Sequence, residues 1–277
     1  MCHEYESGLI NARSVTKKIP LIHNLIDEYD LKCLAITETW LKASCSDTAI
    51  LDVAPPGYSI HYTHRPGEKS GGGVAIVAHK SLNAKPINLQ YNYSSFESVV
   101  VRLSVSNNKR LNVVVLYRPP RSADFVNEIH MLIQESASMR GETIIVGDFN
   151  SPSSASGDLI DTDLNFAIES ENFANHVTEP THSANNILDL VLSSQLSNIV
   201  QSITVNDVSL SDHLLVIANL SCSFIHNPPI TFAMRNYKRL DVNEFRMRLS
   251  KSTFVTNPPQ SVNDYANMNE RRDNINT

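Results

Sequence analysis

Acidic, amide, phenol and imidazole side chains occur at or beside several short apolar runs of this sequence. These side chains belong to Asn11, Glu38, Tyr117, Asp148 with Asn150, Asp189, and Asp212 with His213. A carboxylate such as that of Glu38 suits Mg²⁺, an Asp and a His can activate water, and Asn and Tyr can donate hydrogen bonds to a phosphoryl oxygen. If the fold brings these groups together, their chemistry is the metal-assisted hydrolysis of a phosphoester.

The segment Thr143–Pro152 shows why such residues stand out. Ile144–Val146 is a short, β-branched apolar run that predicts a buried strand, and it stops at Gly147. Asp148 and Asn150 therefore follow a core strand at its carboxyl end, where a carboxylate is costly unless something pairs with it. Gly, Asp, Asn, Ser and Pro are also turn formers, so this segment alone is equally compatible with a surface turn.

Asp189 is a second acid in an apolar run, residues 187–192. Alternation along a strand puts it on the face of Ile187 and Val191, where an unpaired carboxylate is expensive. The segment Ser209–His213 precedes another apolar run and could supply a partner.

Strands and helices must bring these residues together. Apolar runs predict strands at residues 33–37, 74–77, 97–105, 111–116, 144–146, 187–192 and 214–217, the fourth paired with the third as a hairpin. A strand near Leu9 is predicted to be short or to lack its start. Helical spacing predicts helices from Ile19 to about Tyr29 and from Phe125 to Met139, and a short helix at 164–168 within a polar surface excursion, 151–175.

Polar residues at the ends of strands on one side of layered sheets lie close together, and α/β folds place their ligands there. Gly71–Gly73 could be mistaken for a phosphate-binding loop, but it lacks a following Lys-Ser/Thr pair and a helix, and we interpret it as a turn into the strand at 74–77. His61, His64 and His79 lack the spacing of metal ligands and are expected to be surface or strand residues.

Composition limits the class of protein. The 277 residues are 42% hydrophobic, which is ample for a packed core, and no apolar run approaches the length of a membrane span. The formal net charge of −6 argues against coating nucleic acid by bulk electrostatics but not against an enzyme that acts on it. Four cysteines are widely spread, and Cys33 and Cys222 are expected in the core. The expected compartment is intracellular.

Six motifs in order resemble those of the endonuclease/exonuclease/phosphatase superfamily, in particular the apurinic-type endonuclease domain of non-LTR (LINE-type) retrotransposons. The motifs are Asn11, Ile36–Leu41, Leu116–Pro120, Val146–Asn150, Leu188–Leu192 and Ser211–His213. The resemblance implies an α/β fold, a four-layer sandwich of two mixed β-sheets packed face to face with helices outside. It implies a Mg²⁺-dependent DNA endonuclease that nicks duplex DNA and leaves a 3′-hydroxyl.

The resemblance also implies a metal set. Glu38 would bind Mg²⁺, for which Mn²⁺ could substitute, with Asn11 beside it, and Asp212 would complete the metal or water network. Arg13 stands where apurinic repair enzymes often carry an acid, which favours the retrotransposon subgroup over a repair enzyme.

The remaining roles concern the substrate. By resemblance, Asp148 would orient or deprotonate the attacking water, Asn150 and Tyr117 would hold the scissile phosphate, and His213, oriented by Asp189, would hydrogen-bond a phosphate oxygen. From the residues themselves, Arg118 and Arg121 could contact DNA phosphates, but solvated arginines in a Pro-rich loop are an equal alternative.

The chain is expected to contain the catalytic domain in residues 1–222. Residues 223–277 are expected to form a linker-like tail with a short helix capped by Asp241, disordered from Asn257 onward, without a reverse transcriptase domain. The chain would then be a fragment, a truncated copy or a separately expressed domain. The expected partners are duplex DNA and, in an intact element, a reverse transcriptase domain, with action on chromosomal DNA in the nucleus.

Three other interpretations remain. A phosphatase or phosphodiesterase on the same scaffold would act on a different phosphoester, because fold does not fix substrate. A catalytically inactive remnant would retain the fold alone, and each polar residue could then be a cap or a paired core residue. A serine hydrolase using Ser211 with His213 is disfavoured, because two residues this close on a strand entry are not a nucleophile elbow.

Overall fold

The computed structural model describes residues 4–65, 71–105, 110–120, 122, 124–152, 160–221, 241–258 and 260–261. The chain divides into two units, residues 1–226 and 227–277. The predictions for Arg121 and for Cys222 lie outside the described residues, as does most of the segment from Asn257 onward.

Two six-stranded mixed sheets form the first unit. The first sheet has the spatial order β11 (Val200–Asn206), β12 (Leu215–Ser221), β1 (Glu4–Asn11), β2 (Cys33–Thr37), β4 (Val74–His79) and β3 (Tyr58–Thr63). The second has the order β5 (Lys85–Pro86), β6 (Glu97–Ser104), β7 (Arg110–Tyr117), β8 (Glu142–Asp148), β10 (Asp189–Ser194) and β9 (Phe173–Asn175). The pairs β1/β2 and β7/β8 are parallel, and the other paired strands are antiparallel.

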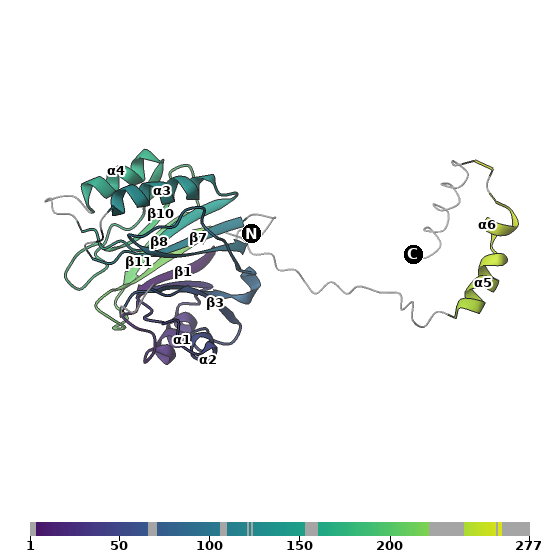
Figure 1. Cartoon of the computed structure of the whole chain (residues 1–277), viewed down its shortest axis with the longest axis horizontal. Coiled ribbons are helices and arrows are strands. Elements are labelled where there is room, and N and C mark those ends of the chain that lie inside the picture. Colours follow the sequence, from purple (N-terminus) through teal and green to yellow (C-terminus); the bar gives the residue numbers. More distant parts are fainter. Residues whose placement is uncertain are drawn as a thin grey trace. The chain divides into compact units, whose positions relative to one another are not determined.

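Helices cover the outer faces of both sheets (Figure 1). Helices α1 (Ile19–Glu28) and α2 (Asp47–Leu51) lie on the side of the first sheet, and α3 (Phe125–Ser138) and α4 (Thr162–Ser170) on the side of the second. The apolar stripe of α1, including Ile22 and Ile26, packs in one buried cluster with Ile10 and Ile36 of the first sheet. The predicted four-layer α/β sandwich is confirmed.

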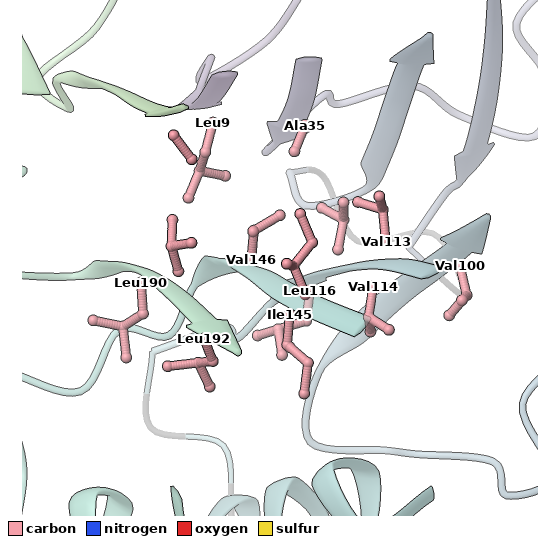
Figure 2. Close-up of a cluster of buried hydrophobic side chains, with 14 of the residues drawn as sticks. Leu9, Ala35, Val100, Val113, Val114, Leu116, Ile145, Val146, Leu190 and Leu192 are labelled. Carbon is pink, nitrogen blue, oxygen red and sulfur yellow. The ribbon is translucent and has the colours of Figure 1, made fainter. Parts of the chain in front are cut away.

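The main core lies between the two sheets. Figure 2 shows Leu9 and Ala35 of the first sheet facing Val113 and Val146 of the second, and all four are buried. Because successive side chains of a strand point to opposite faces, the neighbouring residue Ile145 points away from this layer toward the helices. Close-packed β-branched and aliphatic side chains therefore hold the two sheets against each other, and this packing fixes the positions of the strand ends.

Most predicted elements are confirmed, but the prediction for the first strand is wrong in its length. The predicted helices at Ile19 and Phe125 and the strands from Cys33 to Leu215 are present, and Gly71–Gly73 is the turn into β4, with positive φ at each glycine. The first strand, however, is not short. β1 runs for eight residues from Glu4, because it is a central strand that pairs with β12 on one side and β2 on the other.

The excursion at 151–175 is also more ordered than predicted. It contains the nine-residue helix α4, whose Leu164 and Ile168 are fully buried, and the short strand β9. Asp161 caps α4 by accepting hydrogen bonds from the backbone N–H of Asp163 and Leu164.

The second unit contains α5 (Val242–Ser250) and α6 (Thr253–Thr256). Asp241 is the N-cap of α5 and accepts hydrogen bonds from the backbone N–H of Asn243 and Glu244. None of the residues of α5 is buried. Across the described residues, each helix is too short or too polar to cross a membrane.

Candidate active site

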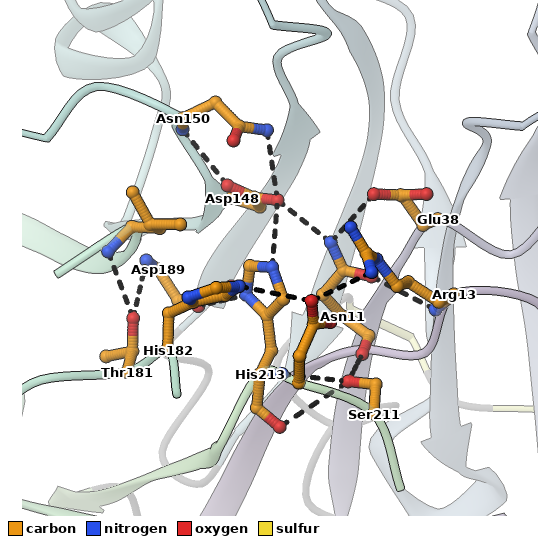
Figure 3. Close-up of polar contacts among 12 residues, drawn as sticks. Asn11, Arg13, Glu38, Asp148, Asn150, Thr181, His182, Asp189, Ser211 and His213 are labelled. Carbon is orange, nitrogen blue, oxygen red and sulfur yellow. Dashed lines mark hydrogen bonds and ion pairs between the residues drawn. The ribbon is translucent and has the colours of Figure 1, made fainter. Parts of the chain in front are cut away.

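Asp148 is the last residue of β8 and lies at the centre of a polar cluster between the two sheets (Figure 3). In the second sheet it is paired with Tyr117 of β7 on one side and Asp189 of β10 on the other. The residue before it must be glycine: Gly147 has φ +154°, and a Cβ there would lie 1.9 Å from the carbonyl oxygen of Leu116. This close approach of β8 to β7 sets the position of the Asp148 carboxylate.

Three donors hold the buried Asp148 carboxylate. Its Oδ2 accepts hydrogen bonds from Asn11 Nδ2 at 2.9 Å and from Asn150 Nδ2 at 3.2 Å, and its Oδ1 accepts one from the Asn150 backbone N–H at 3.0 Å. Asn150 Nδ2 also donates to the Arg118 carbonyl oxygen at 2.8 Å. Both N–H groups of the Asn150 amide are thus in use, and in this arrangement Asn150 orients Asp148.

His213 pairs with both acids. Its Nδ1 lies 2.7 Å from Asp189 Oδ2, and its Nε2 lies 3.9 Å from Asp148 Oδ2. Because an ionised carboxylate only accepts hydrogen bonds, Nδ1 carries the proton and Nε2 faces Asp148. Asp189 is therefore placed to fix the orientation of the imidazole, and all three side chains are buried.

Thr181 and Ser211 support this pair. The Thr181 hydroxyl accepts hydrogen bonds from the backbone N–H of Leu188 and of Asp189, both at 3.0 Å, at the start of β10. The Ser211 hydroxyl donates to the Asn11 carbonyl oxygen at 2.6 Å and accepts from the His213 backbone N–H at 3.1 Å. Ser211 is thus a structural link between strand ends, consistent with the exclusion of a serine nucleophile.

The protonation of this cluster is strongly perturbed. Burial, followed by the negative charge of Asp189, raises the pKa of the Asp148 carboxyl to about 8. Burial disfavours the His213 imidazolium, but the hydrogen bond to Asp189 and the charges of the nearby carboxylates outweigh burial and raise the pKa of His213 to about 9. An acid with a raised pKa beside a histidine with a raised pKa is typical of a site that moves protons.

Asn11 connects Asp148 to Glu38 of the other sheet. Asn11 Nδ2 donates to Glu38 Oε1 at 3.2 Å as well as to Asp148, and the Trp40 indole N–H donates to Glu38 Oε2 at 2.9 Å. Glu38 and Trp40 have φ of 49° and 56°, and Arg13 and Asn150 are also in the left-handed region, at 42° and 45°. Such backbone is uncommon for residues with a side chain and gathers at functional sites.

Asp212 pairs with a base and with a second histidine of the cluster. Its Oδ2 lies 2.8 Å from Arg13 Nη1 and 3.2 Å from His182 Nε2, and the ring of His182 makes an edge contact with the ring of His213, with centroids 4.8 Å apart. Burial opposes ionisation of Asp212, but Arg13 and the hydrogen bonds outweigh burial and hold the pKa of the carboxyl below its usual value.

Tyr117 is buried at the end of β7, and the Arg65 guanidinium lies 5.6 Å from the centroid of its ring. Burial, then the charges of Glu38 and Asp148, raise the pKa of the Tyr117 phenol, so its hydroxyl stays protonated. Arg65 in turn donates a hydrogen bond to Glu97. Tyr117 thus provides a neutral donor beside the acids.

Arg118 does not extend freely from the site. Its guanidinium stacks over Phe125, 4.1 Å from the ring centroid, and donates to the Asn150 carbonyl oxygen at 3.3 Å and to the Ser122 hydroxyl at 3.2 Å. The structure therefore gives Arg118 a role in holding the loop that carries Asn150.

The residues that sequence patterns did not reveal are Thr181, His182 and Arg65. Thr181 and His182 precede β10 in a segment without strand or helix periodicity, and His182 reaches the site through an isolated bridge to His213. The only signal in the sequence was indirect: the acid Asp189 needs partners, and a Thr-His pair lies a few residues before it.

The donor set fits a hard divalent cation. Asp189 Oδ1 and Asp212 Oδ1 are buried and have no hydrogen-bond partner among the described residues, so each is an acceptor oxygen without a donor. The ligand atoms of Asp148, Asp189 and His213 all lie within 4.8 Å of one another, as do those of His182, Asp212 and His213. Carboxylate oxygens such as those of Asp148, Asp189 and Asp212 are the ligands that Mg²⁺ and Mn²⁺ prefer.

Comparisons with known proteins agree with the predicted resemblance. The RNA-directed DNA polymerase from mobile element jockey of Drosophila melanogaster is 24% identical over 144 residues, which are 52% of this chain and 14% of that protein. The chain thus spans a small part of the length of this curated relative.

Solved structures have the same fold at low identity. An AP endonuclease, LMAP, from Leishmania major has a TM-score of 0.66 and 13% identity, over 79% of this chain and 88% of that one. The endonuclease domain of TRAS1, a telomere-specific non-LTR retrotransposon, has a TM-score of 0.57 and 14% identity, over 78% and 98%.

A family match covers the site itself. The Endonuclease/Exonuclease/phosphatase family matches residues 10–213, from the residue before Asn11 to His213. Endonucleases, exonucleases and phosphatases all hydrolyse phosphoester bonds, and the family in general depends on a divalent metal ion. Because the match extends over well more than half of the sequence and over every strand end that forms the cluster, the chain belongs to the endonuclease/exonuclease/phosphatase family.

Proposed function

We propose that this chain is a divalent-metal-dependent DNA endonuclease that hydrolyses one phosphodiester of duplex DNA and leaves a 3′-hydroxyl. The observation that carries the proposal is the network in which Asn11 joins the half-buried Glu38 to the buried Asp148 while Asp189 holds His213 against Asp148. The similarity to the jockey protein and to the TRAS1 endonuclease domain supports DNA as the substrate class and a retrotransposon setting. In that setting a reverse transcriptase would use the 3′-hydroxyl, and the nucleus would be the place of action.

Each residue of the network has a step in the proposed reaction. Asp148, once ionised, accepts the proton of the attacking water, and Asn150 and Asn11 keep its carboxylate oriented. Protonated His213 donates from Nε2 to a phosphate oxygen as negative charge develops, while Asp189 holds its Nδ1. Tyr117 donates a hydrogen bond from its hydroxyl to the same phosphate, and the leaving 3′-oxygen takes up a proton from solvent to become the 3′-hydroxyl.

Glu38, Asn11 and Asp212 would hold Mg²⁺ or Mn²⁺. A bound divalent cation supplies charge stabilisation for the phosphate and its leaving oxygen. The indole N–H of Trp40 on Glu38 Oε2 would keep that carboxylate aimed at the ion.

A plasmid-nicking assay tests the proposal. Supercoiled plasmid should be converted to the open circle with Mg²⁺ and not with EDTA, and Asp148→Ala and His213→Ala should each slow nicking by about 10²–10⁴-fold, the usual effect of losing a positioned acid or base. Two control variants, Asp163→Ala in the first turn of α4 and His130→Ala on α3, remove an aspartate and a histidine outside the site. Both should nick plasmid at the rate of the parent. Full activity in both site variants would show that the assigned residues are wrong.

A phosphatase or phosphodiesterase acting on another phosphoester is the second candidate, because the family name includes phosphatases and the network would bind any phosphoryl group. The same preparations should be assayed for phosphate release from small phosphomonoesters. Release that depends on Asp148 and His213, without plasmid nicking, would favour this candidate. If the parent chain shows neither plasmid nicking nor phosphate release, the network is retained in an inactive remnant.

A further inference from the structure

A cavity of about 660 Å³ lies where the edges of the two sheets face each other. Edge strand β3 of the first sheet lines one side with His61–Thr63, β6 of the second sheet lines the other, and the segments 86–89 and 91–93 before β6 complete it. We call this cavity the edge groove. Its volume is in the range of small-ligand sites, and it uses none of the residues to which the proposed reaction assigns a step.

Two tyrosine rings that line the edge groove, Tyr93 and Tyr91, differ in how closely other side chains hold them. Tyr93 is fixed: its ring stacks on Phe96, with centroids 4.9 Å apart, and its hydroxyl donates to Glu135 at 2.9 Å. Among the described residues, the ring of Tyr91 makes an edge contact with the ring of Tyr93, with centroids 6.5 Å apart, and Tyr91 is 52% exposed. The Tyr91 ring therefore presents a flat apolar surface at the mouth of the groove.

In the described lining of the edge groove, no ionised side chain lacks a hydrogen-bond partner. Glu97 is the sole acidic or basic residue of the lining apart from His61, and its carboxylate accepts hydrogen bonds from Arg65 and from the Gly73 backbone N–H. Burial lowers the pKa of His61, so the imidazole is neutral, and its Nε2 is buried without a hydrogen-bond partner among the described residues. A buried polar atom of this kind gains from a ligand that offers a donor or an acceptor.

The edge groove begins next to the candidate active site. Arg65 binds Glu97, which lines the groove, and its guanidinium also lies over the ring of Tyr117. A DNA strand held at Tyr117 would therefore have its adjoining nucleotides within reach of the groove. The combination of a flat aromatic surface, a neutral hydrogen-bonding nitrogen and the absence of free charge in the described lining suits a nucleobase and does not suit a phosphate.

We propose that the edge groove binds a single unstacked nucleobase of the DNA strand held at the candidate active site, with the base stacked on Tyr91 and hydrogen-bonded by His61 Nε2. The inference rests on the proposed DNA substrate. Taking a base out of a duplex costs a few kcal/mol, and least at a mismatch or a flexible step. The groove would therefore make the enzyme choose cut sites by how easily a neighbouring base unstacks.

Binding without cleavage is the first test. The full chain in EDTA is titrated with a single-stranded pentathymidylate and with the matching pentamer whose sugars lack bases. The parent should bind the pentathymidylate at least 5-fold more tightly, since stacking of one base on an aromatic ring is worth about 1–3 kcal/mol, or roughly 5- to 150-fold. Tyr91→Ala should lose this preference, and His61→Ala should weaken it, while Tyr91→Phe should keep it.

Two controls separate recognition from folding. Tyr91 is exposed, so its replacement should leave the thermal unfolding midpoint unchanged. Phe166→Ala on α4 removes another exposed aromatic ring, 73% exposed, away from the groove and should bind both pentamers like the parent. Equal binding of the two pentamers by the parent, or a preference that survives Tyr91→Ala, would overturn the proposal.

Cleavage provides the second test and separates the groove from the proposed function. On a duplex with one mapped cut site, a mismatch beside the cut should raise kcat/KM in the parent and in Tyr91→Phe but not in Tyr91→Ala. A parent that nicks with no effect of mismatch in any variant would overturn the groove and leave the endonuclease standing. A parent that prefers the base-containing pentamer through Tyr91 but does not nick would support the groove and overturn the endonuclease.

Discussion

The charge of Asp189 acts on two neighbours at once. Burial, followed by repulsion from Asp189, raises the pKa of Asp148 to about 8. Burial lowers the pKa of His213, but the hydrogen bond to Asp189 and the attraction of the nearby carboxylates outweigh burial and raise it to about 9. In the proposed reaction, Asp148 must lose its proton to accept one from water, and His213 must keep its proton to donate to phosphate. We therefore expect kcat/KM for nicking to rise with pH as Asp148 ionises, to peak between about 8 and 9, and to fall as His213 loses its proton.

Asp189→Asn tests the sign of this coupling. Removing the charge takes away the repulsion that raises the pKa of Asp148 and the attraction that raises the pKa of His213, so both limbs should move to lower pH. The measurement is kcat/KM over the pH range for parent and variant. A profile that kept its position or moved to higher pH would mean that Asp189 does not set these protonation states.

Thr181 gives a prediction about stability. Its buried hydroxyl satisfies two backbone N–H groups, so Thr181→Val leaves both without a partner and should lower the free energy of unfolding by about 2–4 kcal/mol. Thr181→Ser keeps the hydroxyl and should lose much less. Urea unfolding of the three proteins measures the difference, and equal losses in the two variants would point to lost packing of the methyl group instead.

Among single residues, the sequence reveals those that interrupt a run of apolar residues. Asp148 and Asp189 could be selected because a carboxylate beside or inside an apolar strand requires a partner. Thr181 and His182 could not, because nothing local distinguishes them from loop residues. His182 forms a bridge to His213, and Thr181 accepts hydrogen bonds from Leu188 and Asp189. These contacts exist only after the chain has folded.

Among the elements, α3 anchors the segment that lines the edge groove. Glu128 of α3 accepts hydrogen bonds from the backbone N–H and the hydroxyl of both Ser94 and Ser95. Burial opposes ionisation of Glu128, but these hydrogen bonds outweigh burial and hold the pKa of its carboxyl below the usual value. A group with a depressed pKa in the folded state stabilises the fold above its unfolded pKa and loses that effect as pH falls through the folded pKa.

We expect Glu128→Gln to lower the free energy of unfolding by about 1–2 kcal/mol at pH 7, since hydrogen bonds to a charged acceptor are lost. The difference from the parent should shrink as pH falls below about 4.3, where the unfolded carboxyl is protonated. Glu28→Gln on the exposed side of α1 is the matched control and should not differ from the parent. A deficit independent of pH would place the loss in packing, not in charge.

The strands missed by sequence interpretation have a common position. β3, β5, β9 and β11 are the outermost strands of the two sheets, and all the predicted strands lie inside them. An inner strand is covered on both sides and reads as a continuous apolar run, such as Cys33–Thr37. An edge strand has one neighbour and often one face exposed to solvent, so β11 mixes exposed polar residues with half-buried ones and carries a weaker signal.

For the whole molecule, the first unit should be sufficient for folding and for nicking. No residue of α5 is buried, so removing residues 227–277 takes away no core side chain from that helix. We expect a chain ending at residue 226 to unfold within about 2 °C of the full chain, which corresponds to less than 1 kcal/mol. It should also nick plasmid at the same rate. A markedly lower midpoint would show that the tail contributes to the stability of the fold.

The amide of Asn11 spans the seam of the sandwich, with Glu38 in its own sheet and Asp148 in the other, through the two hydrogens of a single nitrogen. A small slide of one sheet over the other would lengthen one of these bonds while leaving both sheets and most of the core intact. The rate of nicking should therefore depend on how the two sheets are aligned with each other. On heating, nicking should be lost at a temperature where circular dichroism still reports a folded protein. A core substitution such as Val146→Ala should lower the temperature at which nicking is lost.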